Sequence, residues 1–504
     1  MKIFLRLISL VLVLLMILPV SLISCNANKS PSTPEGADNN GGDIAQNQNA
    51  QDSPENIEPV AKITYDVPEM DCEGYNFKVV DRGGWYYWTT VDMYAEADNG
   101  EPINDAVFKR NILLEEKFNI SISEIQKEDV LVYVQKIIQS GSDDFDVLYP
   151  TMYNTSTLVQ KGLLLNLYDV PHLDFDKPWW DKTVNDSMTI GNKLYTAAGN
   201  ISVTINDATW CVMFNKDLCR DYNLDDPYLQ VKDGKWTLDV LHANCRAVTK
   251  DLDGDGVLGP TDQWGAVNQH ECAYCLFAGS GQKVIEKDKD DLPKLALNDS
   301  RSVDVLTRVI EFLSDATAQI KADDYYGKYD NVWDAINIQS FNDSRALYYI
   351  SPIESVKFMR NMEANFGILP LPKYNEAQDK YYNALQYGNA TGMSIPITAS
   401  NLVRTGAILE AWAAESVETL TRAYYDINLT GKYTRDDESS DMLDVIFSTR
   451  VIDQGLLFNW AGMLDFFTVP SQKKKLDFAS LYEKSEPKWI KAIEKTLEAI
   501  EENN

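Results

Sequence analysis

Strand-like and helix-like segments alternate in the first part of this chain, and this alternation constrains the fold more than any other feature. The apolar pattern predicts strands at 75–80, 120–126 and 144–149, with helices at 104–118 and 130–140 between them. Strands that alternate with helices form right-handed βαβ units around a mostly parallel sheet. The sequence therefore predicts an α/β fold, with any ligand beyond the carboxyl ends of the strands.

Length and charge limit the classes of protein to which this chain can belong. Roughly 445 residues follow position 60, too many for one hydrophobic core and suited to two or three lobes. Hydrophobic residues make up 44% and aromatic residues 11% of the chain, as expected for a packed globular protein. The net charge of −30 argues against nucleic acid or an anionic membrane face as the main partner, because phosphate groups would be repelled.

The N-terminus has the pattern of an export signal. Lys2 and Arg6 form a positive head, residues 8–20 are almost all apolar, and Leu22-Ile-Ser-Cys25 follows. This pattern predicts a signal peptide over residues 1–24. The last four residues resemble the bacterial lipobox, in which the signal is cut before the cysteine and the thiol receives a diacylglycerol. A lipid on Cys25 would hold the mature chain on the outer face of a membrane. The alternative is an ordinary signal peptide in which Cys25 is incidental.

A polar segment separates this cysteine from the rest of the chain. Residues 25–60 are rich in Asn, Ser, Pro, Gly and Gln and contain almost no large apolar side chain. Such a segment buries too little surface to offset its chain entropy. We therefore predict a disordered tether over 25–60 and a folded body over 61–504. The alternative is that part of the tether packs on the body.

The remaining cysteines give no unique pairing. Six cysteines in an exported chain allow 15 disulfide connectivities, and the sequence cannot choose among them. His270-Glu-Cys272-Ala-Tyr-Cys275 looks like a fragment of a zinc or redox site, but the chain has only two other histidines, His172 and His242. Buried or bridged structural cysteines are favoured. The six are Cys72, Cys211, Cys219, Cys245, Cys272 and Cys275.

An acidic loop has the spacing of a calcium site. Three aspartates at alternate positions can converge on one hard cation, and Gly256 allows the sharp turn that follows them. The loop departs from an EF-hand at position twelve, where Asp replaces the bidentate Glu, and it contains Pro260. We expect a structural Ca²⁺; the alternative is an acidic surface turn. The predicted ligands are Asp251, Asp253, Asp255, the Val257 carbonyl and Asp262.

A series of short motifs in a fixed order carries a family resemblance. The motifs are Asp144-Phe-Asp-Val-Leu148, Gly162-Leu-Leu-Leu-Asn-Leu167, Pro178-Trp-Trp-Asp181, Ile190-Gly-Asn-Lys-Leu-Tyr195, Phe214-Asn-Lys216, Gly234-Lys-Trp-Thr-Leu-Asp239, Gly367-Ile-Leu-Pro-Leu-Pro-Lys373 and Ile395-Pro-Ile397 followed by a helix to Ala414. The order of these motifs makes the chain similar to the bacterial extracellular solute-binding proteins of carbohydrate-type ABC importers. The resemblance implies the type II periplasmic-binding-protein-like fold, in which two α/β lobes joined by hinge segments close over a solute.

The resemblance gives expected lobe boundaries. The first lobe is expected at about 70–205 plus about 365–400, and the second at about 206–364 plus about 401–504.

Carbohydrate binding needs aromatic faces for the sugar rings and polar groups for the hydroxyls. Aromatic and polar residues follow several predicted strands, precede a crossing between lobes or lie in an aromatic loop near the C-terminus. The candidate ligand-binding residues are Trp85, Tyr86, Trp88, Tyr153, Asp207, Trp210, Ser351, Tyr387 and Trp460, with Glu354 and Asn389 nearby.

The sequence thus predicts a lipid-anchored, monomeric receptor at the surface of a Gram-positive-type cell. It would bind a sugar or oligosaccharide and deliver it to ABC permease subunits, without catalysis. Two alternatives remain. A surface glycan hydrolase needs two carboxylates across a sugar bond, and 76 acidic residues can supply candidates. A lipoprotein that senses solute for a membrane kinase would share the same fold and cleft.

Overall fold

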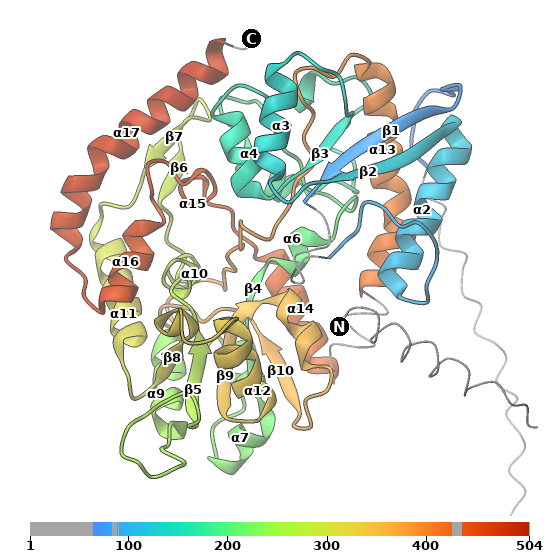
Figure 1. Ribbon diagram of the computed structural model, residues 1–504. Coiled ribbons are helices and arrows are strands. Elements are labelled where there is room, and N and C mark those ends of the chain that lie inside the picture. Colours follow the sequence, from blue (N-terminus) through green and yellow to red (C-terminus); the bar gives the residue numbers. More distant parts are fainter. Residues whose placement is uncertain (1–63, 83–87, 89, 426–435, 503–504) are drawn as a thin grey trace, which may run out of the picture. The chain divides into compact units, whose positions relative to one another are not determined.

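The computed structural model describes residues 64–82, 88, 90–425 and 436–502 (Figure 1). These residues belong to one compact unit. The predicted signal peptide, Cys25 and the tether lie outside the described residues, as do Trp85 and Tyr86. Within the described part of the chain, every helix is too short or too polar to span a lipid bilayer.

A three-stranded parallel sheet is built from the N-terminal βαβ units, as predicted. Its strand order is β2-β1-β3, with residues 75–81 of the central strand paired to 120–126. The helix between β1 and β2 starts at Pro102, which needs no N–H donor there, and ends where Asn119 adopts a left-handed conformation. The bounds are β1 Tyr75–Asp81, α2 Pro102–Phe118, β2 Ile120–Gln126, α3 Val130–Gln139, β3 Val147–Tyr149, α4 Met152–Val159 and α5 Lys182–Met188.

A second, five-stranded sheet has the order β10-β4-β9-β5-β8 (Figure 1). Strand β4 runs antiparallel to both of its neighbours, whereas β5 runs parallel to β9 and β8. The elements of this part are α6 Thr204–Asp207, β4 Trp210–Asn215, α7 Lys216–Asp221, α8 Pro227–Lys232, α9 Leu238–Val248, β5 Trp264–Asn268, α10 Cys272–Gly279, β6 Ile285–Lys287, β7 Pro293–Leu295, α11 Ser300–Ser314, β8 Gln319–Lys321, α12 Gln339–Asn342, β9 Ala346–Pro352 and β10 Phe366–Leu369. Strands β6 and β7 form a separate hairpin.

The C-terminal part is helical and contacts strand β10 of the five-stranded sheet and helices from both halves of the fold. Helix α13 packs against α2, α14 against β10, and α15 against α4, while α16 contacts α10 and α11. Their bounds are α13 Leu402–Ser416, α14 Asp437–Ser448, α15 Gln454–Phe458, α16 Asp465–Lys473 and α17 Phe478–Glu502.

The chain passes from one sheet to the other at identifiable backbone pairs. Residues 208–210 hydrogen-bond to 384–386, beside the five-stranded sheet, and residues 390–394 hydrogen-bond to 148–152, beside the three-stranded sheet. We call 386–390 the return crossing.

Two packing facts bear on the predicted lobe boundaries. Strand β10, expected in the first lobe, pairs with β4, and α13, expected in the second, packs on α2. A boundary near 387 fits this pairing better than one near 365.

A buried polar network holds the segment that leads into β4. The guanidinium of Arg110, on α2, donates to the carbonyl oxygens of Asp92 (2.7 Å) and Ile201 (3.1 Å). The Asp92 carboxylate accepts from Ser202 Oγ (2.8 Å) and from the backbone N–H of Val203 (2.7 Å). All of these side chains are buried, so each bond replaces one that water would otherwise make.

Replacing Arg110 with Met should destabilise the fold by about 3–5 kcal/mol, because it leaves two buried carbonyls and the Asp92 charge without their donor and counter-charge. Lys109→Met, at an exposed position of the same helix, is the matched control and should change stability by about 0.5 kcal/mol or less. Urea denaturation of both variants measures the difference. Equal midpoints for the two variants would contradict the role assigned to Arg110.

Candidate functional site

The carboxyl ends of the parallel strands β5 and β9 meet at one edge of the five-stranded sheet. A pocket with an empty volume of about 430 Å³ lies there, where parallel sheets usually hold their ligands. We call it the strand-end pocket. It is lined by Trp88, Gln269, Glu271, Trp333, Tyr349, Ser351, Pro352, Glu354, Gln386 and Asn389.

Two of the predicted ligand-binding residues, Trp88 and Ser351, line this pocket. The ring of Trp88 packs edge-on against Phe358 at 4.7 Å between centroids, which fixes the indole at the wall. The Ser351 hydroxyl shares a hydrogen bond of 2.6 Å with Ser355. Each side chain is therefore held in place before a ligand arrives.

Two carboxylates line the pocket, the half-buried Glu271 and the buried Glu354, and each accepts a hydrogen bond from an amide of the return crossing. Glu271 accepts from Gln386 Nε2 at 2.6 Å and from Gln269 Nε2 at 3.0 Å. Glu354 accepts from Asn389 Nδ2. Burial raises the pKa of Glu271 to about 7 and the pKa of Glu354 to about 8. The pocket thus combines acceptors with amide groups that can both donate and accept.

Sequence reasoning missed Glu271, Gln269, Gln386 and Trp333. A signal for the first two existed, because they directly follow β5 just as Ser351 ends β9. In the sequence, Glu271 stands out only as part of the metal-like fragment with His270 and Cys272.

Trp333 connects the pocket to an exposed aromatic segment. It begins the π-helix η3 (Trp333–Ile338), and Tyr326 meets its ring edge-on at 5.7 Å. The side chains of Tyr326 and Tyr329 are 59% and 43% exposed. The indole Nε1 of Trp333 is buried and has no hydrogen-bond partner among the described residues.

Asp207 and Trp210 lie beside the pocket but do not line it. Asp207 is buried and accepts from Thr90 Oγ1 and from the Tyr424 hydroxyl, the latter at 2.7 Å. Its charge contributes to the raised pKa of Glu354. Trp210 is fully buried at the start of β4 and donates from Nε1 to the Tyr274 hydroxyl at 3.2 Å. Both residues therefore support the crossing rather than the pocket wall.

Tyr153, Tyr387 and Trp460 also lie outside the pocket lining. The rings of Tyr153 and Tyr387 are 6.0 Å apart, and the Tyr387 hydroxyl accepts from the backbone N–H of Asp453 at 2.9 Å. Trp460 is buried and donates to Thr496 Oγ1 at 2.9 Å, which fixes its loop to α17. These three side chains pack the structure. The predicted Trp85 and Tyr86 lie outside the described residues.

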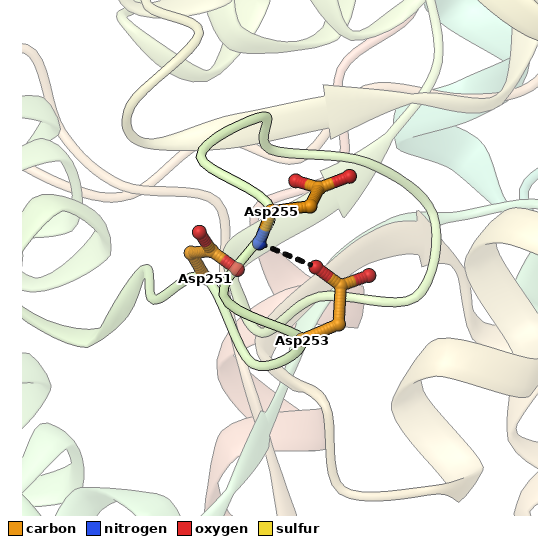
Figure 2. Close-up of side chains that lie close together, drawn as sticks. All are labelled: Asp251, Asp253 and Asp255. Carbon is orange, nitrogen blue, oxygen red and sulfur yellow. Dashed lines mark hydrogen bonds between the residues drawn. The ribbon is translucent and has the colours of Figure 1, made fainter.

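The acidic loop brings together three of its predicted ligands (Figure 2). Carboxylate oxygens of Asp251, Asp253 and Asp255 lie within 4.8 Å of one another. Asp262 is buried apart from them, and its two oxygens accept from the backbone N–H groups of Leu252 and Gly259. Asp262 thus closes the loop and does not reach the group as a twelfth-position ligand.

The cysteines are not paired within the described residues. Cys72 is partly exposed and the other five are buried thiols. His270 contacts Ser471 through Nδ1 (3.2 Å) and Asp324 through Nε2 (3.3 Å), and not the thiols of Cys272 and Cys275. This arrangement favours structural cysteines over the zinc or redox fragment.

Comparison with known proteins identifies the fold and the family. The family model for the bacterial extracellular solute-binding protein matches residues 100–417. No curated protein matches the sequence.

Solved structures are similar to this chain at low sequence identity. An ABC substrate-binding protein from Listeria monocytogenes in complex with cycloalternan has a TM-score of 0.52 at 13% identity, covering 85% of this chain and 99% of that one. A cyclo/maltodextrin-binding protein complexed with maltotetraose has a TM-score of 0.52 at 16% identity, and the match covers 85% of this chain and 97% of that one. The GacH receptor of Streptomyces glaucescens, described with acarbose, has a TM-score of 0.50 at 13% identity, and the match covers 85% of this chain and 98% of that one. The predicted two-lobed, type II periplasmic-binding-protein-like α/β fold is confirmed.

The raised pKa of Glu271 predicts a pH-dependent stability. Its folded-state pKa of about 7 lies above the ordinary value of 4.5, so its contribution is complete below about pH 4.5 and is lost as the pH rises through about 7. Glu271→Gln should therefore stabilise the protein at pH 8, by up to about 3 kcal/mol, and leave it unchanged near pH 4.5. Unfolding curves at both pH values test this, with the exposed Glu286→Gln as control. A gain that is the same at both pH values would contradict it.

Proposed function

Because the chain belongs to the bacterial extracellular solute-binding proteins, we propose that it captures an oligosaccharide outside the cell for an ABC importer. The observation that carries the sugar assignment is the strand-end pocket. It offers two indole rings, Trp88 and Trp333, beside the carboxylates Glu271 and Glu354 and the amides that bind them. Aromatic faces bind the apolar faces of sugar rings, and carboxylates and amides bind the hydroxyls.

The exposed tyrosines support an oligosaccharide over a single sugar. Tyr326 contacts Trp333 at the pocket wall, and Tyr329 lies three residues further along the same loop. The Tyr326 hydroxyl donates to Asp323 Oδ1 at 3.1 Å, so the ring is held while most of it stays in contact with solvent. Sugar units that extend beyond the pocket can stack on such rings.

Delivery to a permease would follow closure of the two lobes. The pocket wall combines the ends of β5 and β9 with residues of the return crossing. A ligand in the pocket therefore contacts groups of both parts, and movement of the return crossing changes the distance between these groups. A solute that binds the closed arrangement more tightly shifts the population toward it. Permease subunits would recognise that closed form, and the receptor would act as a monomer.

Attachment to the membrane is part of this proposal. The lipobox-like Leu22-Ile-Ser-Cys25 and the polar segment 25–60 would place the body on a lipid-bound tether at the surface of a Gram-positive-type cell. A tethered receptor stays near its transporter instead of diffusing away.

A structural calcium ion is a second element of the proposal. Asp251, Asp253 and Asp255 can supply the oxygen ligands that Ca²⁺ prefers, and the Val257 carbonyl is the next group along the loop. Asp262 keeps its two backbone hydrogen bonds and so holds the loop closed around the ion. The ion would stabilise the loop between α9 and β5.

Calorimetric titration with maltose- and cellulose-type oligosaccharides of increasing length, with product analysis, tests the receptor function. We expect binding without product, and about a tenfold or greater loss of affinity in Trp333→Ala because the stacking face is removed. Tyr168→Ala, an exposed tyrosine far along the chain from the pocket residues, is the control and should bind normally. Release of shorter sugars would favour a hydrolase, and no binding of any glycan would exclude the sugar assignment.

Chelation tests the calcium ion. EDTA should lower the melting temperature by about 3 °C or more, and added Ca²⁺ should restore it, since an ion that binds only the folded state stabilises it. Asp253→Asn should abolish the response, whereas Asp290→Asn, in another exposed acidic turn, should retain it. A melting temperature that does not respond to EDTA or Ca²⁺ in the unmodified protein would rule out a structural ion.

A further inference from the structure

A second pocket lies beside the segment that leads into β4 and shares no lining residue with the strand-end pocket. Its empty volume is about 660 Å³. Six polar residues from four separate parts of the chain contribute to its lining. They are Asp181, Asn200, Asn206, Thr421, Tyr425 and Arg450. We call this the arginine pocket.

Arg450 is fixed in this pocket by its backbone. The backbone groups of its two neighbours bond to Asn383: Asn383 donates its N–H to the Thr449 carbonyl at 3.0 Å, and Val451 donates to the Asn383 carbonyl at 2.9 Å. Residue 383 directly precedes the segment that pairs with 208–210. The backbone of residue 450 therefore has a defined position next to the crossing between the sheets.

Among the described residues, this guanidinium has one carboxylate within 4.0 Å, and it also lies 5.6 Å from the ring centroid of Phe447. The Arg450 side chain is 8% exposed, and its carboxylate neighbour Asp181 lies 3.9 Å away, measured from Nη2 to Oδ2. Asp181 cannot easily come closer, because its other oxygen accepts from the backbone N–H of Val184 at 3.0 Å and caps α5. The Nε of Arg450 is buried and has no hydrogen-bond partner among the described residues.

A buried cation with an unused donor is costly unless a ligand completes its interactions. The planar fork of arginine matches the two oxygens of a carboxylate, and such charge-assisted pairs are the strongest hydrogen bonds in proteins. Asn200 and Thr421 add amide and hydroxyl groups at the same pocket, which suit the hydroxyl groups of a polyol. The volume exceeds what a carboxylate alone would fill.

We propose that the arginine pocket is a second binding site, separate from the strand-end pocket, which takes a sugar acid with its carboxylate on Arg450. Asp181 keeps its contact with one hydrogen of Nη2, and the ligand carboxylate pairs side-on with Nε and the other hydrogen of Nη2. The hydroxyl groups of the ligand bind Asn200 and Thr421.

Such a ligand would bridge two parts of the crossing. Asn206, on α6, donates to the Tyr425 hydroxyl at 3.4 Å, so the pocket wall already connects the segment before β4 with the one after α13. A sugar acid held between Asn200 and Arg450 adds a second connection there. Its binding would therefore change the free energy of lobe movement, and with it the affinity of the strand-end pocket.

The test uses D-glucuronate and its uncharged analogue D-glucuronamide, with binding followed by calorimetry. We expect glucuronate to bind the unmodified protein and glucuronamide to bind at least tenfold more weakly, because only the carboxylate pairs with the guanidinium. Arg450→Met should lose glucuronate binding. Arg450→Lys should weaken it, since lysine keeps the charge and lacks the fork.

Arg220→Met is the matched control, because it removes the same charge from an exposed position. It should bind glucuronate normally. Thermal melting of each variant shows whether it is folded, and a folded Arg450→Met that still binds the glycan of the strand-end pocket supports a separate site. Equal binding of glucuronate and glucuronamide, or of glucuronate by a folded Arg450→Met, would overturn the proposal. So would absence of glucuronate binding to the unmodified protein, whatever the strand-end pocket binds.

Discussion

The buried network around Arg110 and Asp92 is the constraint on which the rest of the structure depends. It fixes residues 201–203 against α2, and a chain of hydroxyl groups carries the connection further: Ser202 Oγ to Thr204 Oγ1 at 2.9 Å, and Thr204 Oγ1 to Thr391 Oγ1 at 2.7 Å. Thr204 begins α6, which leads into β4, and Thr391 lies just after the return crossing.

The same network adds directed polar contacts to an apolar core that contains side chains of both sheets, such as Val80 of β1 and Val212 of β4. Hydroxyl and carboxylate groups in such a network form a small number of directed bonds, which fix the geometry at the crossing more specifically than apolar contacts do. Asp207 repeats this arrangement on the side of the strand-end pocket, where it binds Thr90 and Tyr424. The crossing is therefore held by hydrogen bonds that connect segments far apart in the sequence.

The sequence predicted the local elements and the fold class but few of the pocket residues. Strands β1 and β2 and helices α2 and α3 follow from apolar periodicity and end signals within a few residues. The candidate side chains are aromatic or polar residues that follow strands, precede a crossing between lobes or lie in an aromatic loop. That criterion found Trp88 and Ser351, and it also selected Trp210 and Trp460, whose indole N–H groups have partners inside the core. Whether an aromatic ring faces a pocket or a core depends on tertiary packing, which local patterns do not contain.

Glu271 and Gln386 show that local sequence patterns also miss pocket residues whose contact is long-range. They lie 115 positions apart and become one hydrogen-bonded pair only when β5 and the return crossing meet. No local pattern contains that contact, although the rule that ligands bind beyond parallel strand ends would have drawn attention to Glu271.

The pairing of carboxylates with crossing amides has a consequence for binding. Glu271 and Glu354 belong to the five-stranded sheet side, whereas Gln386 and Asn389 belong to the return crossing. These pairs orient the polar groups before a solute arrives, which lowers the entropy cost of binding. Any movement of the crossing changes the same hydrogen bonds, and a solute that bonds to both members of a pair favours one crossing geometry. Recognition of the solute and selection of the closed arrangement are then one event, because the same atoms take part in both.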